Sequence, residues 1–534
     1  MLVAEVVVKG LLDAGARESY GVPGGEVLDF IEASRKMGLP FILTRHESAA
    51  SFMADLAGQI SGKPGVCLST LGPGATNMLT GVANAYLDRS PVIAITGQMS
   101  PEAYPEMPHQ RIDLCSLYRA VTKWSVRVTA DNVGAVVPAA VAVAMRRPRG
   151  PVHLELASTV SRSDAALPGL LRDGEQPPAG EQASTITMSE VSERLARAAH
   201  PAIVAGVNMD PVAVAGPLRR LAECAGIPVL VSPKAKGVFP HDHPLFVGVA
   251  TGMAADDRVM EFIESCDLLL GIGFDASEAD KTWPARAPMI WLEDAPRDKA
   301  EWDGDYIVGS IADTLVALTA GYHGKHQWTQ EEVSRARAHI REKVDPKSSC
   351  ACSRISPARA LRAIREALPA DGAFICDVGA HKLLSGQAWP SNSPHTFFMS
   401  NGLSSMGYGV PGAIAVKRYV GQHPVVAVVG DGGFAMMVHE IETAVRLGQG
   451  VVYVVFNDES LSLIQVVQSR RNLERYGIDF GGSRWSLIAE GFGARGVRVS
   501  SLEELEAAVR QGLSARGPVV IDVPVDASEY AMQI

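Results

Sequence analysis

The chain has 534 residues, of which 47% are hydrophobic and 20% charged, so it has the composition of a globular protein too long for a single hydrophobic core. A formal net charge of −10 argues against a surface built to bind nucleic acid or an anionic membrane. Since no apolar run reaches the length of a membrane span, the N-terminus has no basic, cleavable signal and the seven cysteines are scattered, we expect a cytoplasmic protein without nucleic-acid or membrane partners.

Helical and strand patterns alternate from the N-terminus onward, which predicts an α/β fold with mainly parallel sheets. In the first block, residues 1–162, a strand at 40–44 ends in Arg45-His46-Glu47 and is followed by a helix at 48–60. Taken alone, Glu47 could be a solvated cap at the carboxyl end of the strand. Two turns rich in Gly and Pro, at 20–25 and 70–77, precede and follow it in the sequence.

A polar stretch at 161–189 is interpreted as a linker to the second block, residues 188–322. Four short apolar runs are the predicted strands of this block: 202–205, 228–231, 268–271 and 289–292. Gly271-Ile272-Gly273 follows the third run, but position 276 is Ala, so we interpret it as a structural turn rather than a dinucleotide site. A charged helix at 329–344 comes next. The isolated Cys350-Ala351-Cys352 lacks the second ligand pair of a zinc site.

The last block, residues 354–534, contains the most informative pattern. A strand at 425–429 runs into Gly430-Asp431-Gly432-Gly433, and a strand at 451–456 ends in Asn457-Asp458, with a helix predicted at 435–447 between them. Parallel strands of such a βαβ unit bring both turns to one edge of the sheet, where ligands of these folds bind. Either aspartate alone could be an ordinary turn residue. Together with the glycines they predict a diphosphate cofactor held through a magnesium-type ion.

This spacing resembles the thiamine diphosphate-binding motif, and most of the chain resembles thiamine diphosphate-dependent enzymes of the acetolactate synthase type. The resemblance implies three doubly wound parallel-sheet domains, namely a pyrimidine-binding, a central and a diphosphate-binding domain. It also implies that Asp431, Asp458 and the backbone carbonyl of Ser460 coordinate Mg²⁺. The glycines of the first turn would offer backbone N–H groups to the diphosphate, close to a helix N-terminus expected near Phe434; they are Gly430, Gly432 and Gly433.

By the same resemblance, the other cofactor contacts come from loops of the first and last domains. Glu47 would hydrogen-bond N1′ of the aminopyrimidine and favour its imino tautomer, and burial that raises its carboxyl pKa would suit this role. Gln110 would shape the substrate side, and Met406 would hold the bent conformation of the cofactor. Further contacts are implied for Pro23, Gly24, Pro73, Asn77, Gly379, Ala380, His381 and Ser404. Relatives often have Gln in place of Ala380 and Gly in place of Ser404.

Such an enzyme would decarboxylate a 2-oxo acid, here expected to be pyruvate, and transfer the acyl carbanion to a second carbonyl, so that two pyruvates give 2-acetolactate. The alternatives are another thiamine diphosphate enzyme, namely a 2-hydroxyacyl-CoA lyase, a sulfoacetaldehyde acetyltransferase or a 2-oxo acid decarboxylase, and a non-catalytic paralogue. The chain has no His-His dipeptide, which decarboxylases of the family often use as a proton relay. It retains Glu47 and both acidic metal ligands, which a non-catalytic paralogue should have lost.

His109-Gln110 and Asn457-Asp458 resemble the FAD-independent, catabolic members of the family, and two further departures from the biosynthetic members also bear on subtype, so we do not expect bound FAD. Gly252-Met253-Ala254 stands where those members often have His-Gly-Thr, and Val467 stands where they often have tryptophan. The resemblance also implies a homodimer or homotetramer, because relatives build each site from the pyrimidine domain of one subunit and the diphosphate domain of another.

Overall fold

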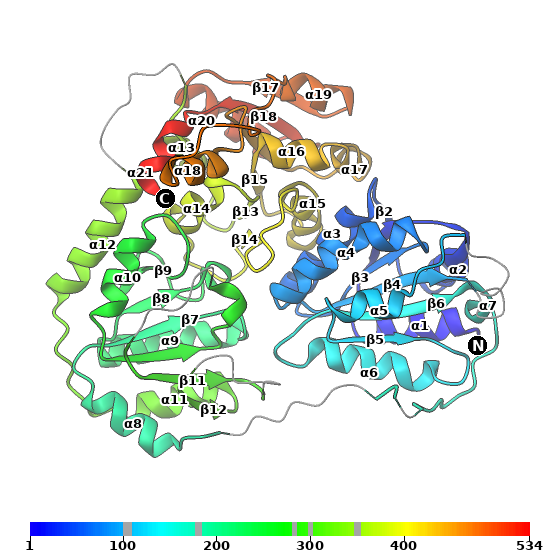
Figure 1. The fold of residues 1–534 in the computed structure, drawn as a ribbon, viewed down its shortest axis with the longest axis horizontal. Coiled ribbons are helices and arrows are strands. Elements are labelled where there is room, and N and C mark those ends of the chain that lie inside the picture. Colours follow the sequence, from blue (N-terminus) through cyan, green and yellow to red (C-terminus); the bar gives the residue numbers. More distant parts are fainter. Residues whose placement is uncertain (100–108, 173, 177–183, 280–285, 297–302, 346–353) are drawn as a thin grey trace. The chain divides into compact units, whose positions relative to one another are not determined.

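The structure is a computed structural model that describes the chain except for residues 100–108, 173, 177–183, 280–285, 297–302 and 346–353 (Figure 1). The expected Cys350-Ala351-Cys352 segment therefore lies outside the described residues. By their internal contacts the residues form two compact units. The first comprises Met1–Ala179, Pro411–Gly421 and Glu442–Leu447, and the second comprises Gly180–Val410, Gln422–Ile441 and Gly448–Ile534. In the described parts of the chain, no helix is both long and apolar enough to cross a membrane.

The first sheet lies in the N-terminal part of the chain, and its six strands are all parallel. Their spatial order is β2 (Phe41–Leu43), β1 (Ser19–Val22), β3 (Gly65–Ser69), β4 (Val92–Gln98), β6 (Val152–Ala157) and β5 (Trp124–Arg127). The helices of this region are α1 (Val3–Asp13), α2 (Leu28–Met37), α3 (Glu47–Ser61), α4 (Pro73–Leu87), α5 (Leu114–Arg119), α6 (Val133–Met145) and α7 (Ser158–Ser161). Since β2, β1 and β3 are neighbours, the loops that follow them leave the sheet at one edge.

The second sheet is also parallel, with the order β12 (Asp305–Val308), β11 (Met289–Glu293), β10 (Leu268–Ile272), β7 (Pro201–Ala205), β8 (Val229–Val231) and β9 (Phe246–Val249). Its helices are α8 (Met188–Arg197), α9 (Pro211–Ala225), α10 (Asp256–Glu264), α11 (Ile311–Gly321) and α12 (Gln330–Val344). Gly273 has a φ of +54° and is followed by a short 3₁₀ turn, Ala276–Glu278, rather than by an α-helix. This geometry agrees with the predicted structural turn.

The third sheet, parallel as well, has the order β14 (Phe397–Met399), β13 (Ala373–Cys376), β15 (Val425–Gly430), β16 (Val452–Asn457), β18 (Val519–Pro524) and β17 (Arg495–Arg498). Its helices are α13 (Pro357–Ala367), α14 (Ala380–Ala388), α15 (Gly409–Val420), α16 (Asp431–Met437), α17 (Glu440–Arg446), α18 (Ser462–Arg470), α19 (Trp485–Gly491), α20 (Leu502–Leu513) and α21 (Tyr530–Gln533). β15 and β16 are parallel neighbours, so the predicted βαβ unit is confirmed. The single helix predicted at 435–447 is wrong, because two helices fill the interval and the first begins at Asp431.

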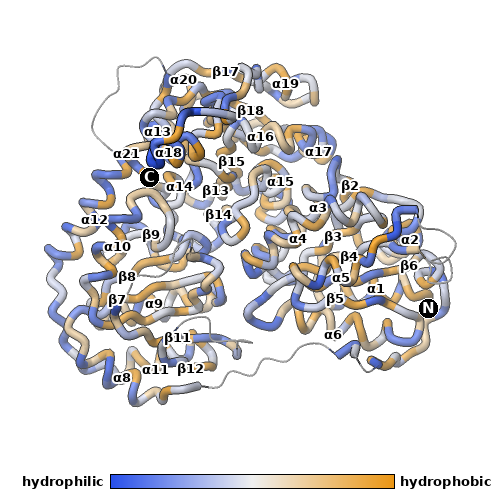
Figure 2. The backbone as a smooth tube through the Cα atoms, in the orientation of Figure 1, coloured by the Kyte–Doolittle hydropathy of each residue, from blue (hydrophilic) through white to orange (hydrophobic). Residues whose placement is uncertain are grey.

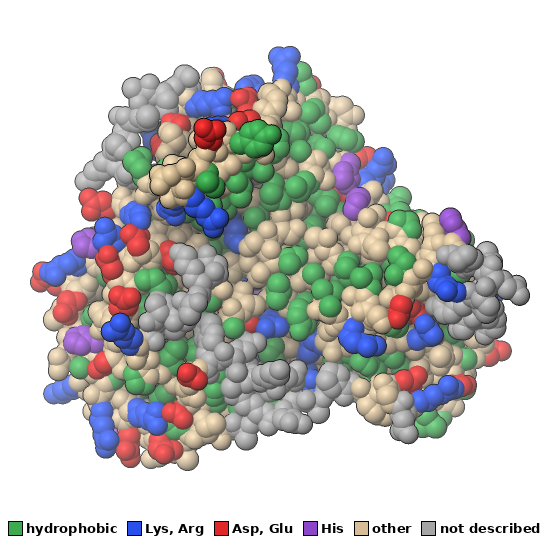
Figure 3. Space-filling model, viewed as in Figure 1, with side chains coloured by type: hydrophobic (Ala, Val, Ile, Leu, Met, Phe, Trp, Pro, Cys, Tyr) green, Lys and Arg blue, Asp and Glu red, His purple; other side chains and the backbone are tan. Residues whose placement is uncertain are grey.

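Among the described residues, one hydrophobic cluster joins strands of the first sheet to helices such as α1, α2 and α6, and another runs continuously through the second and third sheets. In Figure 2 the sheet strands are mainly hydrophobic, whereas α12 is mainly hydrophilic. On the face drawn in Figure 3, acidic and basic side chains are interspersed over the helices of the second sheet. Three parallel sheets with flanking helices confirm the predicted fold class.

Candidate active site

Two loops meet at the carboxyl edge of the first sheet. The loop after β1 carries Pro23 and Gly24, and a Cβ atom on Gly24 would overlap the side chain of Thr70 in the loop after β3. Thr70 Oγ1 in turn donates a hydrogen bond of 2.5 Å to Glu26 Oε2. Glycine at position 24 therefore allows the two loops to touch, and Pro73 begins α4 directly after them. The structure thus brings the two predicted cofactor loops of this domain together.

Glu47 is the first residue of α3, just beyond β2, and its side chain is half-buried. His46 caps the helix, since its Nδ1 accepts a hydrogen bond from the Ser48 backbone N–H at 3.1 Å. Asn77 Nδ2 donates to Glu47 Oε2 at 3.1 Å, and a Cβ atom on Gly74 would lie 3.3 Å from Glu47 Oε1. The Asn77 amide therefore holds the Glu47 carboxylate over the start of α4, and the missing side chain of Gly74 leaves space for it there.

Gln110 lies against the same loop. A Cβ atom on Gly72 would be 2.9 Å from the Cβ atom of Gln110, and Gly72 itself has a φ of +59°, which favours glycine. Gln110 also has a positive φ, +57°, an uncommon conformation for a residue with a side chain. Its side chain is exposed. Backbone strain of this kind gathers at functional sites, which agrees with the predicted role of Gln110 without testing it.

In the third sheet, the turn after β15 is already helical. α16 begins at Asp431, so Gly432 and Gly433 lie in its first turn. The first backbone N–H groups of a helix have no partner within it, and the helix dipole is positive at that end. The Gly432 N–H donates to Asp431 Oδ1 at 2.8 Å, so the N–H groups that follow it in this turn are the ones that would meet an anion such as a diphosphate. The helix starts three residues earlier than the sequence suggested.

Two carboxylates lie at this helix start, namely Asp431, which is buried, and Asp458, which is half-buried. Asp431 Oδ2 accepts the Glu459 backbone N–H at 2.8 Å, which ties the turn after β15 to the turn after β16. Asp458 Oδ2 accepts the Ser462 hydroxyl at 2.5 Å and Oδ1 accepts the Ser460 N–H at 3.3 Å. Burial, and then the nearby charge of Asp458, raise the pKa of Asp431 to about 7. Burial also raises the pKa of Asp458.

This donor set fits a magnesium ion. The described residues contain no cluster of three or more His, Cys, Asp or Glu side chains that could hold a metal. Mg²⁺, however, is commonly held by one or two carboxylates together with phosphate oxygens and water, which is what the Asp431–Asp458 pair beside an anion-accepting helix start offers. A bound cation would also relieve the repulsion of two carboxylates that share a buried place.

The loop after β13 closes around the same turn. The imidazole of His381 is packed between two glycines. A Cβ atom built on Gly379 would lie 2.8 Å from His381 Cε1, and one built on Gly430 would lie 3.0 Å from it. Its Nε2 is buried without a hydrogen-bond partner in the described structure, and burial lowers the pKa of the ring to about 4. The unpartnered imidazole nitrogen in this position is open to a hydrogen-bonding group of a ligand. Ala380, next to it, is buried and opens α14.

The stretch that carries Met406 packs against α16. A Cβ atom on Gly432 would lie 3.1 Å from Met406 Cε, so the methionine reaches the glycine turn. Ser404, where relatives often have glycine, has a φ of +54°, which explains the family's preference at this position.

Sequence reasoning missed two residues of this half-site. Asp377, at the end of β13, is buried and accepts the backbone N–H groups of Gly407 (3.1 Å) and Gly409 (3.3 Å). It thereby fixes the loop that follows Met406. Lys382 is buried, and its Nζ donates to Ser404 Oγ at 2.7 Å. A lysine directly after His381 in a loop expected to face phosphates was the available signal.

Comparison with known proteins agrees with this geometry. Three family models match the chain: the N-terminal TPP binding domain, the central domain and the C-terminal TPP binding domain of thiamine pyrophosphate enzymes, at residues 1–117, 188–318 and 377–523. The boundaries 1–162, 188–322 and 354–534 stay predictions.

Several curated proteins are similar over almost their whole length. Acetolactate synthase of Bacillus subtilis (strain 168) is 29% identical over 98% of this chain and 93% of its own length. A probable acetolactate synthase large subunit of Methanocaldococcus jannaschii is 29% identical (98% and 92%), and the catabolic acetolactate synthase of Raoultella terrigena is 27% identical (98% and 95%). The chain belongs to the thiamine pyrophosphate enzyme family and is a thiamine diphosphate-dependent, acetolactate synthase-like enzyme.

Proposed function

We propose that this enzyme uses Mg²⁺ and thiamine diphosphate to decarboxylate pyruvate and to join the acyl unit to a second pyruvate, giving 2-acetolactate. The observation that carries the proposal is the pair of carboxylates, the buried Asp431 and the half-buried Asp458, at the glycine-lined start of α16. The names of the relatives support the choice of pyruvate.

The residues of the third sheet would hold the diphosphate end. Asp431, Asp458 and the Ser460 carbonyl would bind the magnesium ion, and the first-turn N–H groups of α16 would bind phosphate oxygens. Lys382 adds a buried positive charge close to Ser404. When bound, thiamine diphosphate supplies the electron sink that allows the bond between the carbonyl carbon and the carboxylate of a 2-oxo acid to break.

The residues of the first sheet would act on the pyrimidine end. Glu47 would hold a proton at N1′ of the aminopyrimidine, and the hydrogen bond from Asn77 fixes one of its oxygens. Because the other oxygen lies over Gly74, it faces no side chain on that side. Gln110, exposed in this chain, would contact the substrate.

We further propose that the central domain works without FAD. Ligands of open α/β sheets bind outside the carboxyl ends of the strands, and here carboxyl side chains fill that edge. Glu278 is buried there, accepts the Val207 N–H at 2.9 Å and the Ser232 hydroxyl, and leaves no room for a side chain on Gly206. Asp275, also buried, accepts from Asn208 Nδ2 at 2.5 Å. The Asp275 side chain at this edge disfavours a dinucleotide's phosphates, whereas Glu278, whose pKa burial raises to about 8, fills the space as a mostly protonated group.

A homodimer or homotetramer is part of the proposal. Apolar side chains are exposed around α18, beside the predicted magnesium site, and a second copy of the chain would cover them. They are Ile464, Val467, Leu473, Tyr476 and Phe480. Sedimentation of the purified protein tests this part, and a monomer at working concentration contradicts it.

Product analysis tests the main proposal. The purified protein is incubated with pyruvate, thiamine diphosphate and Mg²⁺, and acetolactate is measured after its conversion to acetoin in acid. Parallel reactions with glyoxylate, sulfoacetaldehyde or a CoA thioester as acceptor identify a different carboligase. Release of aldehyde alone would make the enzyme a decarboxylase instead, and turnover that depends on added FAD would contradict the flavin-free proposal.

A further inference from the structure

A cavity of about 530 Å³ lies between helix α12 of the second sheet and helices α13 and α14 of the third. Its volume is that of a small-molecule site. Its walls come from β9, α12, α13 and the end of α14, all within one compact unit. None of its lining residues belongs to the loops of the candidate active site.

The apolar walls of the cavity are held firmly. Gln387 Oε1 accepts the Val249 N–H at 2.8 Å, and its Nε2 donates to the Ala254 carbonyl at 3.1 Å, which ties α14 to β9. Lys236 Nζ donates to the carbonyls of Gly386 and Trp389, both at 2.8 Å. Trp389 also stacks on Phe374, with ring centroids 3.7 Å apart. A cavity between elements tied together in this way is preformed rather than a packing gap.

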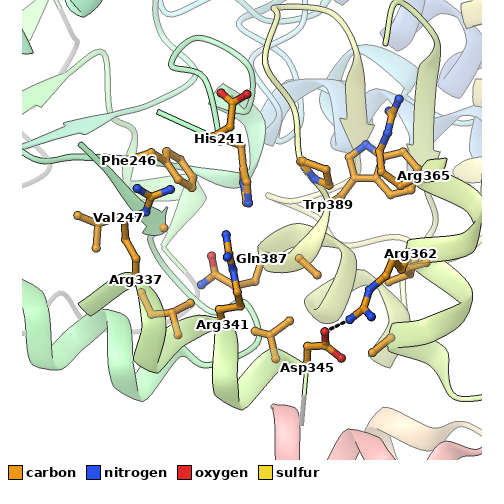
Figure 4. Close-up of a pocket in the computed structure, with 18 of the residues that line it drawn as sticks. His241, Phe246, Val247, Arg337, Arg341, Asp345, Arg362, Arg365, Gln387 and Trp389 are labelled. Atoms are coloured by element: carbon orange, nitrogen blue, oxygen red, sulfur yellow. Dashed lines mark ion pairs between the residues drawn. The ribbon is translucent and has the colours of Figure 1, made fainter. Parts of the chain in front are cut away.

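Charged side chains of both signs line the cavity, with one more arginine than carboxylates. Arg337 and Arg341 lie on successive turns of α12, and in Figure 4 Arg341 extends towards His241 while Arg337 lies beside Phe246. Across the cavity, α13 contributes Arg362 and Arg365. Four arginines face three carboxylates, since Asp242, Asp345 and Glu366 also line the cavity.

The four arginines differ in the hydrogen-bond and ion-pair partners that the protein gives them. Arg362 is paired with Asp345, and Arg365 donates to the carbonyl of Pro369 at 2.9 Å and lies 5.2 Å above the Trp389 ring. Arg337 donates to the Pro244 carbonyl at 3.1 Å. Arg341 has no hydrogen-bond or ion-pair partner within the described part of the chain. It is exposed, so the cavity is open to solvent beside it.

His241 completes the arrangement. Its Nδ1 is buried and has no hydrogen-bond partner in the described structure. Burial, together with the charges of Lys236, Arg341 and Arg337, lowers the pKa of the ring to about 3, so the imidazole is neutral at physiological pH. Two like charges four residues apart on a helix repel each other, and an anion between them would remove that repulsion.

We propose that this cavity binds a small organic anion, namely a carboxylate or phosphate group on a compact apolar body. Arg341 and Arg337 would bind the anionic group, because guanidinium groups pair with carboxylate and phosphate oxygens through two parallel hydrogen bonds. The side chains of Phe246, Val247, Ile340 and Leu361 would contact the apolar body. The site is separate from the proposed reaction and does not depend on it.

The first test uses the unmodified enzyme saturated with thiamine diphosphate and Mg²⁺. Isothermal titration compares benzoate, phenyl phosphate and the neutral benzamide. We expect saturable binding of an anionic probe with a dissociation constant of about 1 mM or tighter, and at least tenfold weaker binding of benzamide. The tighter of the two anions distinguishes a carboxylate site from a phosphate site. Equal affinity for benzamide, or no saturable binding of either anion, would overturn the proposal.

The second test locates the binding. Arg341→Gln and Arg337→Gln should each weaken the anion by about tenfold or more, since each removes a charge-assisted hydrogen bond. Arg335→Gln is the matched control, because Arg335 lies on the same helix, pairs with Glu331 at 2.9 Å and does not line the cavity. Unchanged affinity in both cavity variants would show that the anion binds elsewhere.

A third measurement needs no variant. A crystal soaked with 4-bromobenzoate is examined for anomalous scattering from bromine. A bromine atom between α12 and α14 supports the proposal, and bromine found only at other places contradicts it.

Discussion

Gly432 and Gly433 are neighbours in the first turn of α16, yet the structure predicts different changes in stability when each is replaced by alanine. A Cβ atom on Gly433 would overlap Asp377 Oδ2, well inside the 3.0 Å limit for real Cβ contacts. Asp377 would have to move and lose its hydrogen bonds to the N–H groups of Gly407 and Gly409. A Cβ atom on Gly432 meets only the flexible end of Met406 at 3.1 Å and the ring of Phe480 at 3.2 Å.

The magnitudes follow from these contacts. A hydrogen bond to a charged group contributes about 1.5–3 kcal/mol, and burial already raises the pKa of Asp377 to about 6, so a displaced carboxylate would be poorly compensated. Alanine returns up to about 1 kcal/mol of helix propensity at either position. We therefore expect Gly433→Ala to lower the free energy of unfolding by about 2–3 kcal/mol and Gly432→Ala to change it by less than about 1 kcal/mol.

Urea denaturation of the cofactor-free protein, followed by circular dichroism, measures the difference. With a slope of about 2–3 kcal/mol per molar urea, the Gly433→Ala midpoint should fall by roughly 1 M relative to Gly432→Ala. Both variants keep every backbone N–H group of the turn, so a difference between them reports packing against Asp377. Equal urea midpoints would refute the reasoning, because a methyl group would then be tolerated at position 433 as well as at position 432.

Three further predictions concern chemistry and pH. Glu47→Gln should leave the cofactor bound but slow proton exchange at its C2 by at least about 100-fold, as followed by NMR in deuterated buffer, whereas the exposed Glu32→Gln should exchange normally. Asp458→Asn should raise the Mg²⁺ concentration needed for half-maximal cofactor binding, while Asp371→Asn, which is exposed and pairs with His423, should not; equal requirements would remove Asp458 from the metal site. Burial raises the pKa of Glu278 to about 8, so the folded state holds a proton that the unfolded state has lost, and stability should fall between about pH 4.5 and pH 8. Glu278→Gln should flatten this fall in melting temperature, because the amide does not ionise; a pH dependence identical to the unmodified protein's would contradict the assignment.

The sheets were readable from the sequence because their strands are continuous apolar runs bounded by turn residues. β15 and β16, for example, begin and end within a residue of their predicted positions, at 425–430 and 452–457. Strands buried on both faces of a parallel sheet have this signature. The helix between them was misplaced for a related reason. Asp, Gly and Gly are poor helix formers, so a local reading starts the helix after them, whereas packing against Asp377 and β15 starts it at Asp431.

The break between α16 and α17 had no signal at all. Val438 and His439 separate the two helices, and neither is a glycine or proline. The residue after the break, Glu440, is fully buried. A buried carboxylate needs hydrogen-bond partners, and their positions constrain the path of the backbone. This constraint depends on neighbours distant in sequence, so local helix propensity does not reveal it.

The cofactor residues could be inferred from the sequence, whereas the anion cavity could not, because it depends on contacts between segments that are distant in the sequence. Asp431, Gly432 and Asp458 belong to two turns whose positions follow from one βαβ unit, so their meeting could be inferred from spacing alone. Asp377 contacts Gly407 across 30 residues, and the cavity needs β9, α12, α13 and α14 together. From the sequence alone, Arg337 and Arg341 are two charged residues of a polar helix, and we would expect both side chains to be solvated. They become a candidate site because the turn before β9 places an unsatisfied nitrogen of His241 opposite them, and β9 and α14 add apolar walls. An anionic group on an apolar body is the ligand that would satisfy both the charges and the walls.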